Sequence, residues 1–263
     1  RSLKGEESDT VHIERLDGSS ISGKGFSSSG IYRSIQFSGS VEGIYQRSEE
    51  EQDGAANPEE RDDGGDRFTF SGDSTSIQMT EDNRRTVLTG DARIDSDQVS
   101  IRADSIELYG EDFRFARCSG NVETEEKEKE LDLSSQSLFY DREKDILRIE
   151  GYNEMIDYRN ELVAKSGYLE HRGEKQETIF QIGVRILKAT EETRMVCRGE
   201  FARYDRENSM LTLSGMPVVQ WKEDTYRATR IIINLDSDEI RLEGNVEGTV
   251  TTSGEEDEET DDE

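Results

Sequence analysis

Glycines that recur about every 31 residues constrain the fold of this chain more than any other feature of its sequence. Each follows a short segment of alternating apolar side chains, and the gaps between successive glycines are 30, 31, 32, 32 and 29 residues. The series is Gly90, Gly120, Gly151, Gly183, Gly215 and Gly244. A fixed period of this kind is typical of a repeat array, in which each unit packs against its neighbours.

Gly39 extends the series toward the N-terminus. It lies 51 residues before Gly90, and the gap becomes 31 once the 20-residue acidic segment 47–66 is left out. We therefore expect a repeat domain over residues 10–250 that carries segment 47–66 as a disordered insertion. A flexible N-terminus, 1–9, precedes this domain, and a disordered acidic tail, 251–263, follows it.

Each repeat is predicted to be a bent β-hairpin. Apolar residues alternate along the first arm, and the alternation slips by one position after a small residue, as in LVAKSGYL at 162–169. A strand that bulges and turns from one layer into another gives such a slip. A polar turn follows, and the second arm returns with apolar residues two and four positions before the glycine, as at 211–215. That glycine marks the return corner, where a positive φ or a crowded Cβ position favours glycine.

The predicted fold class is therefore all-β, a β-jellyroll or two-sheet antiparallel β-solenoid of about seven repeats. At ~4.8 Å per strand, each repeat would advance the stack by roughly 10 Å and the whole rod would measure about 70 Å. Only 31% of the residues are hydrophobic. A solenoid accommodates this composition because each repeat buries a narrow apolar stripe against its neighbours.

The net charge of −28 is concentrated in two places. Segment 47–66 and the last nine residues together account for −15 of it, so the remaining chain carries −13. This balance argues against nucleic acid as a partner, because phosphate binding needs clustered Lys and Arg. No run of 18 apolar residues is present, so nothing in the sequence predicts a spanning helix. The chain begins at Arg1, and we expect a signal peptide to have been removed ahead of it.

Nothing in the sequence predicts a catalytic residue, a cofactor or a metal. Cys118 and Cys197 lie about two and a half repeats apart, so they are expected to be free, buried thiols. The two histidines, His12 and His171, lack the spacing of metal ligands. The acids fall mostly in turns and at outward positions, as on a solvated surface. A polysaccharide-active β-helical enzyme nevertheless stays open as an alternative, since a pair of carboxylates would suffice for it.

Three phrases of the sequence resemble the repeat of the OstA/LptA family: LTGDARIDSDQVSIRADSIELYG at 88–110, CSGNVE at 118–123 and LEGNVEG at 242–248. The resemblance covers most of residues 68–250, and related repeats occur in LptC and in the N-terminal part of LptD. It implies a periplasmic β-jellyroll protein that carries lipopolysaccharide from the inner to the outer membrane. The partners it implies are an inner-membrane LptC-like and an outer-membrane LptD-like jellyroll protein, joined through edge strands, with end-to-end self-association as a further option.

In that family acyl chains lie in the trough between the two sheets, and the inward apolar positions of this chain are the candidates for such a site. The predicted trough-lining, lipid-binding residues are Leu88, Ile101, Ile106, Leu108, Val122, Leu133, Leu138, Leu147, Ile149, Leu211, Leu213, Ile231, Ile233, Ile240 and Leu242. In a closed solenoid the same residues would form the core. The negative charge disfavours phosphorylated head groups inside the protein, so a less charged glycolipid is an alternative cargo to lipopolysaccharide. A structural or adhesive solenoid without lipid is the alternative from another functional class.

Overall fold

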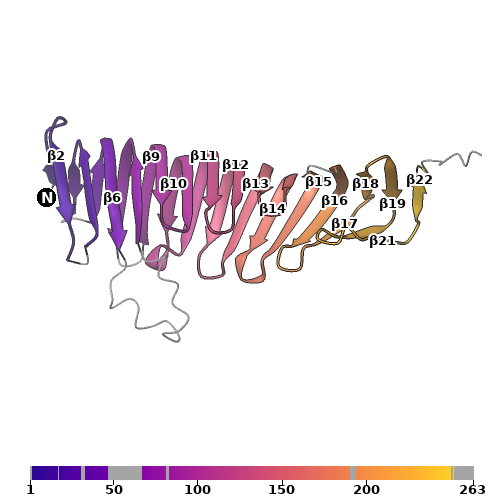
Figure 1. Ribbon diagram of the computed structural model, residues 1–263. Coiled ribbons are helices and arrows are strands. Elements are labelled where there is room, and N and C mark those ends of the chain that lie inside the picture. Colours follow the sequence, from indigo (N-terminus) through magenta and orange to yellow (C-terminus); the bar gives the residue numbers. More distant parts are fainter. Residues whose placement is uncertain are drawn as a thin grey trace, which may run out of the picture.

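The computed structural model describes residues 2–16, 18–30, 33–46, 67–80, 83–189, 194–249 and 251. Within these ranges the chain forms an elongated stack of antiparallel strands that follow one another from the N-terminal to the C-terminal end (Figure 1). The all-β architecture predicted from the sequence is confirmed. The predicted insertion, 47–66, and all but the first residue of the predicted tail, 251–263, lie outside the described residues.

Long strands form the middle of the rod and shorter ones its two ends. The long strands are β9 (Asn83–Asp95), β10 (Val99–Tyr109), β11 (Phe115–Glu126), β12 (Leu131–Asp141), β13 (Ile146–Asp157), β14 (Leu162–Arg172), β15 (Glu177–Ala189) and β16 (Arg194–Asp205). The N-terminal strands are β1 (Ser2–Lys4), β2 (Thr10–Glu14), β3 (Ser20–Lys24), β4 (Ser27–Ser29), β5 (Ser34–Phe37), β6 (Gly39–Gln46), β7 (Arg67–Gly72) and β8 (Ser74–Thr80). The C-terminal strands are β17 (Met210–Ser214), β18 (Val218–Trp221), β19 (Asp224–Arg227), β20 (Arg230–Asn234), β21 (Ile240–Glu243) and β22 (Glu247–Thr249). Two single-turn 3-10 helices, Glu111–Phe113 and Gly173–Lys175, lie between strands.

Every long strand bends near its middle, so that its two halves lie in different layers. The register of β10 with β11 shifts between Arg102 and Ser105, and that of β13 with β14 shifts between Glu150 and Asn153. At the ends of the rod, layer 1 contains the N-terminal strands β1, β4, β5 and β8 and the C-terminal strands β17, β20 and β21. In the middle of the rod it contains the first halves of β9, β11, β13 and β15 and the second halves of β10, β12, β14 and β16. Layer 2 contains β2, β3, β6 and β7, the other halves of the long strands, and then β18, β19 and β22. The two predicted sheets are thus the two halves of one continuous sheet.

The return corners coincide with six of the seven periodic glycines; Gly39 does not have a positive φ, whereas the next residue, Ser40, does. All six glycines of the series from Gly90 to Gly244 have a positive φ, between 62° and 101°. A bulge that reverses the inward side of a strand needs such a backbone conformation, which glycine adopts without steric cost. The prediction of glycine corners is therefore confirmed at these positions.

The space between the layers is filled by the inward side chains of both. One cluster of buried apolar residues runs along the rod from Leu88 to Leu235, and a smaller one around Phe37 lies at the N-terminal end. Cys118 and Cys197 are both free and buried in the larger cluster, as predicted. Burial raises the pKa of each thiol to about 12, which keeps it protonated at neutral pH.

The first residues of the chain form a strand, whereas the sequence predicted a flexible segment over 1–9. Ser2, Leu3 and Lys4 pair with Ser29, Ser28 and Ser27 of β4. All three residues of β1 are exposed, so the strand is held by backbone hydrogen bonds rather than by buried side chains. That explains why the apolar pattern gave no signal for it.

Two corner glycines provide a matched test of the bend. A Cβ added at Gly215 would lie 2.7 Å from the Cβ of Glu200, whereas one added at Gly183 would meet nothing within 4 Å. Both have a positive φ, so alanine costs about 1–2 kcal/mol at either position through backbone strain. We expect Gly215→Ala to lower the urea midpoint of unfolding clearly more than Gly183→Ala, and equal shifts would contradict this packing of the corners.

Candidate functional site

The layers are joined on one side of the rod and free of each other on the opposite side. On the joined side every long strand passes through its corner from one layer to the other. On the opposite side lie the hairpin turns, which alternate between the ends of layer 1, as at 142–145, and the ends of layer 2, as at 127–130. We call the line between these two rows of turns the seam.

Two cavities lie between the layers along the seam. The first, of about 120 Å³, is near the N-terminal end and is lined mainly by apolar side chains such as Ile21, Phe70 and Leu88. The second, of about 390 Å³, lies in the middle of the rod, where Ile101 and Leu133 of layer 2 face Leu138 and Leu147 of layer 1. Its volume falls within the usual range of small-molecule sites. We call these the first and the second seam cavity.

The predicted trough residues divide into three groups in the structure. Two line the first seam cavity and four line the second: Leu88 and Leu108, then Ile101, Leu133, Leu138 and Leu147. Seven are sealed in the core away from both cavities: Ile106, Val122, Ile149, Leu211, Leu213, Ile231 and Ile233. Ile240 and Leu242 are partly buried on β21 at the C-terminal end. The structure thus places six of them beside open space.

The rim of the second seam cavity is polar, in contrast to its floor. Glu126, Glu128 and Lys129 reach it from layer 2, and Arg142 and Asp145 reach it from layer 1. Charges of both signs therefore surround an apolar interior. An amphiphile with its chain inside and its polar group at the rim matches this arrangement.

A buried group of polar side chains crosses the seam directly beside the second cavity. Asp157 at the end of β13 in layer 2 accepts hydrogen bonds from Tyr204 Oη and Arg206 Nε, both from layer 1, each at 2.9 Å. Asn160 Nδ2 donates to Asp157 at 2.9 Å and to Tyr204 Oη at 2.7 Å. We call these four residues the seam bridge, because they tie the two free edges of the layers together.

The seam bridge is held mainly by a buried ion pair. The side chain of Asp157 has no exposed surface and that of Arg206 is 6% exposed. Burial opposes the charged carboxylate, but the hydrogen bonds from Arg206, Asn160 and Tyr204 outweigh it, so the pKa of Asp157 lies below its usual value. Burial and the neighbouring carboxylate both raise the pKa of Tyr204. At neutral pH the carboxyl group of Asp157 is therefore ionised and the hydroxyl group of Tyr204 is protonated.

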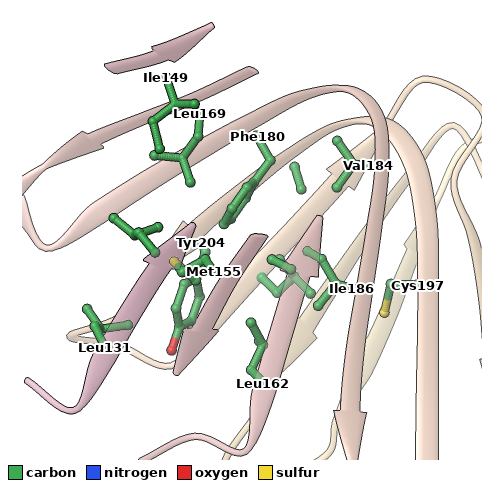
Figure 2. Packing of buried hydrophobic residues seen from close by; sticks show 14 of the residues in the cluster. Leu131, Ile149, Met155, Leu162, Leu169, Phe180, Val184, Ile186, Cys197 and Tyr204 are labelled. Carbon is green, nitrogen blue, oxygen red and sulfur yellow. The ribbon is translucent and has the colours of Figure 1, made fainter. Parts of the chain in front are cut away.

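Beyond the seam bridge the C-terminal half of the rod is closed. Lys188 of layer 2 donates to the carbonyl of Leu235 and, at 3.2 Å, to Asp238, both at the end of layer 1. The side chains between the layers here, including Phe180 and Ile186, are almost completely buried (Figure 2). Both seam cavities, as lined by the described residues, lie on the N-terminal side of the bridge.

His171 stands out among the residues that line the second cavity. Its Nδ1 lies 2.8 Å from Thr178 Oγ1, while its Nε2 is buried without a hydrogen-bond partner among the described residues. Burial lowers the pKa of the imidazole, which is neutral at physiological pH as a result. His171 therefore adds a buried, unpaired polar atom to a lining that also includes Thr124 and Tyr140.

Two further hollows, of about 530 and 520 Å³, lie on the outer face of layer 2. They are lined largely by polar and charged side chains, such as His12 and Glu42 in one and Arg102 and Glu123 in the other. They are less suited to an acyl chain than the smaller seam cavities, because they lack an apolar interior that would bury it.

Buried carboxylates of this chain are paired with arginines rather than exposed in a cleft. Arg114 donates to both oxygens of Asp141, and this holds the pKa of Asp141 below its usual value. Burial opposes ionisation of Glu170, but hydrogen bonds from Arg148 and Arg172 lower its pKa as well. A carboxyl group that donates a proton at neutral pH needs a raised pKa, so these groups are poorly suited to acid catalysis.

No group of three or more His, Cys, Asp or Glu side chains in the described part of the chain could hold a metal ion. None of its helices has the length and apolar character needed to cross a membrane.

Both ends of the rod present strands that are paired on one side only, as far as the described residues go. At the N-terminal end these are β1, paired with β4, and β2, paired with β3. At the C-terminal end they are β21, paired with β20, and β22, paired with β19 (Figure 1). Each leaves backbone donors and acceptors available to a further strand.

Sequence reasoning missed the seam bridge, although a signal for it exists. Along β13 the buried positions include Met155 and then Asp157, so the alternation places an acid on the inward side of the strand. A charge at an inward position of an alternating strand requires a partner, because an unpaired buried charge is strongly destabilising. Its partner, Arg206, is 49 residues away and could not be chosen from the sequence.

The seam bridge predicts strong coupling between its charged members. Arg206→Met leaves the carboxylate of Asp157 buried and unpaired, which should cost about 3–5 kcal/mol in the free energy of unfolding. The double variant Asp157→Leu/Arg206→Met removes both charges and should recover most of that loss. Urea titrations of the single and double variants measure the coupling, and additive effects would show that the pair is not formed.

The bridge should also make stability depend on pH in the acid range. Because the pKa of Asp157 is depressed in the folded state, its contribution is complete above the ordinary value of 3.8 and is lost as the pH falls through the folded value. The melting temperature of the wild type should therefore fall more steeply below about pH 4 than that of Asp157→Leu/Arg206→Met. Parallel profiles of the two proteins would contradict this assignment.

Comparisons with known proteins yield a likeness in structure alone. No family model matches the chain, and no curated protein matches its sequence. Among solved structures, the chain is similar to LptH from Pseudomonas aeruginosa, described as the LptA-homologous periplasmic component of a lipopolysaccharide transport device. The match has 13% sequence identity and a TM-score of 0.30, and covers 59% of this chain and 95% of LptH. The fold of this chain is therefore established by its own strand pairing. LptH is a protein to which the chain is similar in structure.

Proposed function

We propose that this chain is a non-enzymatic, periplasmic lipid-transport protein that binds acyl chains in its seam and passes lipid from the inner toward the outer membrane. The observation that carries the proposal is the second seam cavity. It is open, has a volume of about 390 Å³ and is lined by apolar residues of both layers. The cargo class is lipopolysaccharide or a related glycolipid.

The lining of the second seam cavity stabilises a bound acyl chain through the hydrophobic effect and offers little stabilisation to a charged group. Each methylene transferred from water to such a lining is stabilised by about 0.8 kcal/mol. Ile101 and Leu147 are only partly buried, so the chain would cover apolar surface that is otherwise in contact with water. An acyl chain is the simplest ligand that uses this surface.

The position of the charges indicates where the head group would lie. Glu126, Glu128 and Asp145 at the rim outnumber Lys129 and Arg142, and the chain as a whole has a net charge of −28. A phosphorylated head group would therefore be repelled from the interior and stay outside, in solvent or paired with divalent cations. A glycolipid with fewer phosphates would bind with less repulsion.

The open edges at both ends provide the means of assembly. A partner strand that pairs with β1 or β2 at one end, or with β21 or β22 at the other, would continue the sheet and align its own seam with this one. Jellyroll proteins of the LptC and LptD types, or a second copy of this chain, are the partners we propose. Backbone pairing of this kind needs little sequence specificity at the edge.

Site-specific crosslinking in cells tests the proposal. A photocrosslinking residue at Leu147, which lines the second cavity, should capture lipid, whereas the same residue at Leu213 should not, because Leu213 is completely buried in the closed half. The two positions are matched in side chain, and both lie in layer 1. Mass spectrometry of the adduct identifies the lipid.

Three outcomes distinguish the functions considered. Lipid capture at Leu147 alone supports a conduit that binds lipid in its seam. Capture at neither position, in a protein that still associates end to end, would replace the proposal with a structural scaffold. Cleavage of a glycan that is abolished by changing one Asp or Glu would replace it with an enzyme.

A further inference from the structure

We infer that the seam bridge is the end wall of the lipid-binding groove, so that an acyl chain enters from the N-terminal side and stops at Asp157 and Arg206. The inference rests on the proposed function and adds to it a polarity of the ligand and a limit to its extent. In this arrangement the rod consists of a binding half and a closed half, and lipid is not threaded through its whole length unless the bridge opens.

The bridge directly adjoins the second seam cavity. Arg206 donates through Nη2 to the backbone carbonyl of Lys129, and Lys129 is part of the cavity rim. Leu131, which also lines the cavity, is the register partner of Asp157 on the neighbouring strand. A ligand that extends from this cavity toward the C-terminus therefore meets the bridge within one strand spacing, or about 4.8 Å.

The hydrogen bonds of the bridge prevent an acyl chain from displacing its side chains. A methylene chain offers no hydrogen bonds in return for those that Asp157 receives from Arg206, Tyr204 and Asn160. Displacing one partner would leave a buried charge or hydroxyl unsatisfied, at a cost larger than the gain from burying a methylene. Chains should therefore stop at the bridge or turn toward solvent.

The core directly beyond the bridge is filled by buried side chains. Leu162 is the register partner of Asp157 on β14, and it packs with Met155, Ile186 and Tyr204 in the closed core (Figure 2). The side chains of Leu162 and Ile186 are at most 2% exposed. Inserting a chain there would force apart a core that is already filled.

Two matched double variants distinguish loss of the end wall from a general loss of stability. Asp157→Ala/Arg206→Ala removes both charges and opens space continuous with the second cavity. Arg114→Ala/Asp141→Ala removes an ion pair of the same type, with hydrogen bonds of 2.9 and 3.0 Å, which lies within layer 1 and does not cross the seam. Thermal melts of both variants confirm that they are folded before binding is measured.

The decisive experiment uses the full chain and a fatty acid with a photoreactive group at its methyl end. Mass spectrometry of the labelled peptides shows where that end lies. In the wild type and in Arg114→Ala/Asp141→Ala we expect labels on β10, β12 and the first half of β13. In Asp157→Ala/Arg206→Ala we expect labels on β15 and β16 in addition.

A series of fatty acids of increasing length gives an independent readout. Affinity should rise about fourfold per added methylene while the chain still enters apolar space, and then level off. In Asp157→Ala/Arg206→Ala the rise should continue to longer chains than in the wild type or in the control variant.

The results separate failure of the wall from failure of the proposed function. Labels on β15 or β16 in the wild type, or the same label map in all three folded proteins, would overturn the wall while leaving lipid binding intact. If excess unlabelled fatty acid reduces the labelling of no peptide, lipid binding itself is overturned.

Discussion

Every other feature of this molecule depends on the bend in the middle of each long strand. An antiparallel sheet with straight strands would expose one apolar face along its whole length. The bulge reverses the inward side of each strand at its midpoint, so that the two halves of the same sheet face each other. Glycines with positive φ make the return bend possible at little cost, and their period is therefore the period of the fold.

The same bend creates the asymmetry from which the candidate site arises. On the corner side the layers are covalently joined by every long strand, so their distance is fixed. On the turn side only side chains join them, and those side chains differ along the rod. Where Ile101, Leu133, Leu138 and Leu147 meet, a cavity remains. Where Asp157 meets Arg206 and Tyr204, the layers are tied.

The fold could be predicted from the sequence and the openness of the site could not. The spacing of the glycines and the slip in alternation near small residues are local and repeat many times, so errors at one repeat are corrected by the others. Whether Leu147 lines a cavity and Leu213 is buried is set by the side chains opposite them in the other layer, far away in sequence. Leu147 and Leu211 each lie four residues before a corner glycine, Gly151 or Gly215, yet Leu211 is completely buried, so periodicity alone cannot separate an open position from a closed one. The ion pair across the seam is missed for the same reason.

The closed half of the rod has a mechanical consequence for the open half. Both belong to one continuous sheet, so the backbone ladder that is clamped by Asp157–Arg206 and by Lys188 runs uninterrupted into the strands around the second cavity. The spacing of the two layers around the second cavity is therefore set at the end where the bridge lies. The layers can separate more only with increasing distance from the bridge, so the part of the open seam farthest from the bridge is the most compliant.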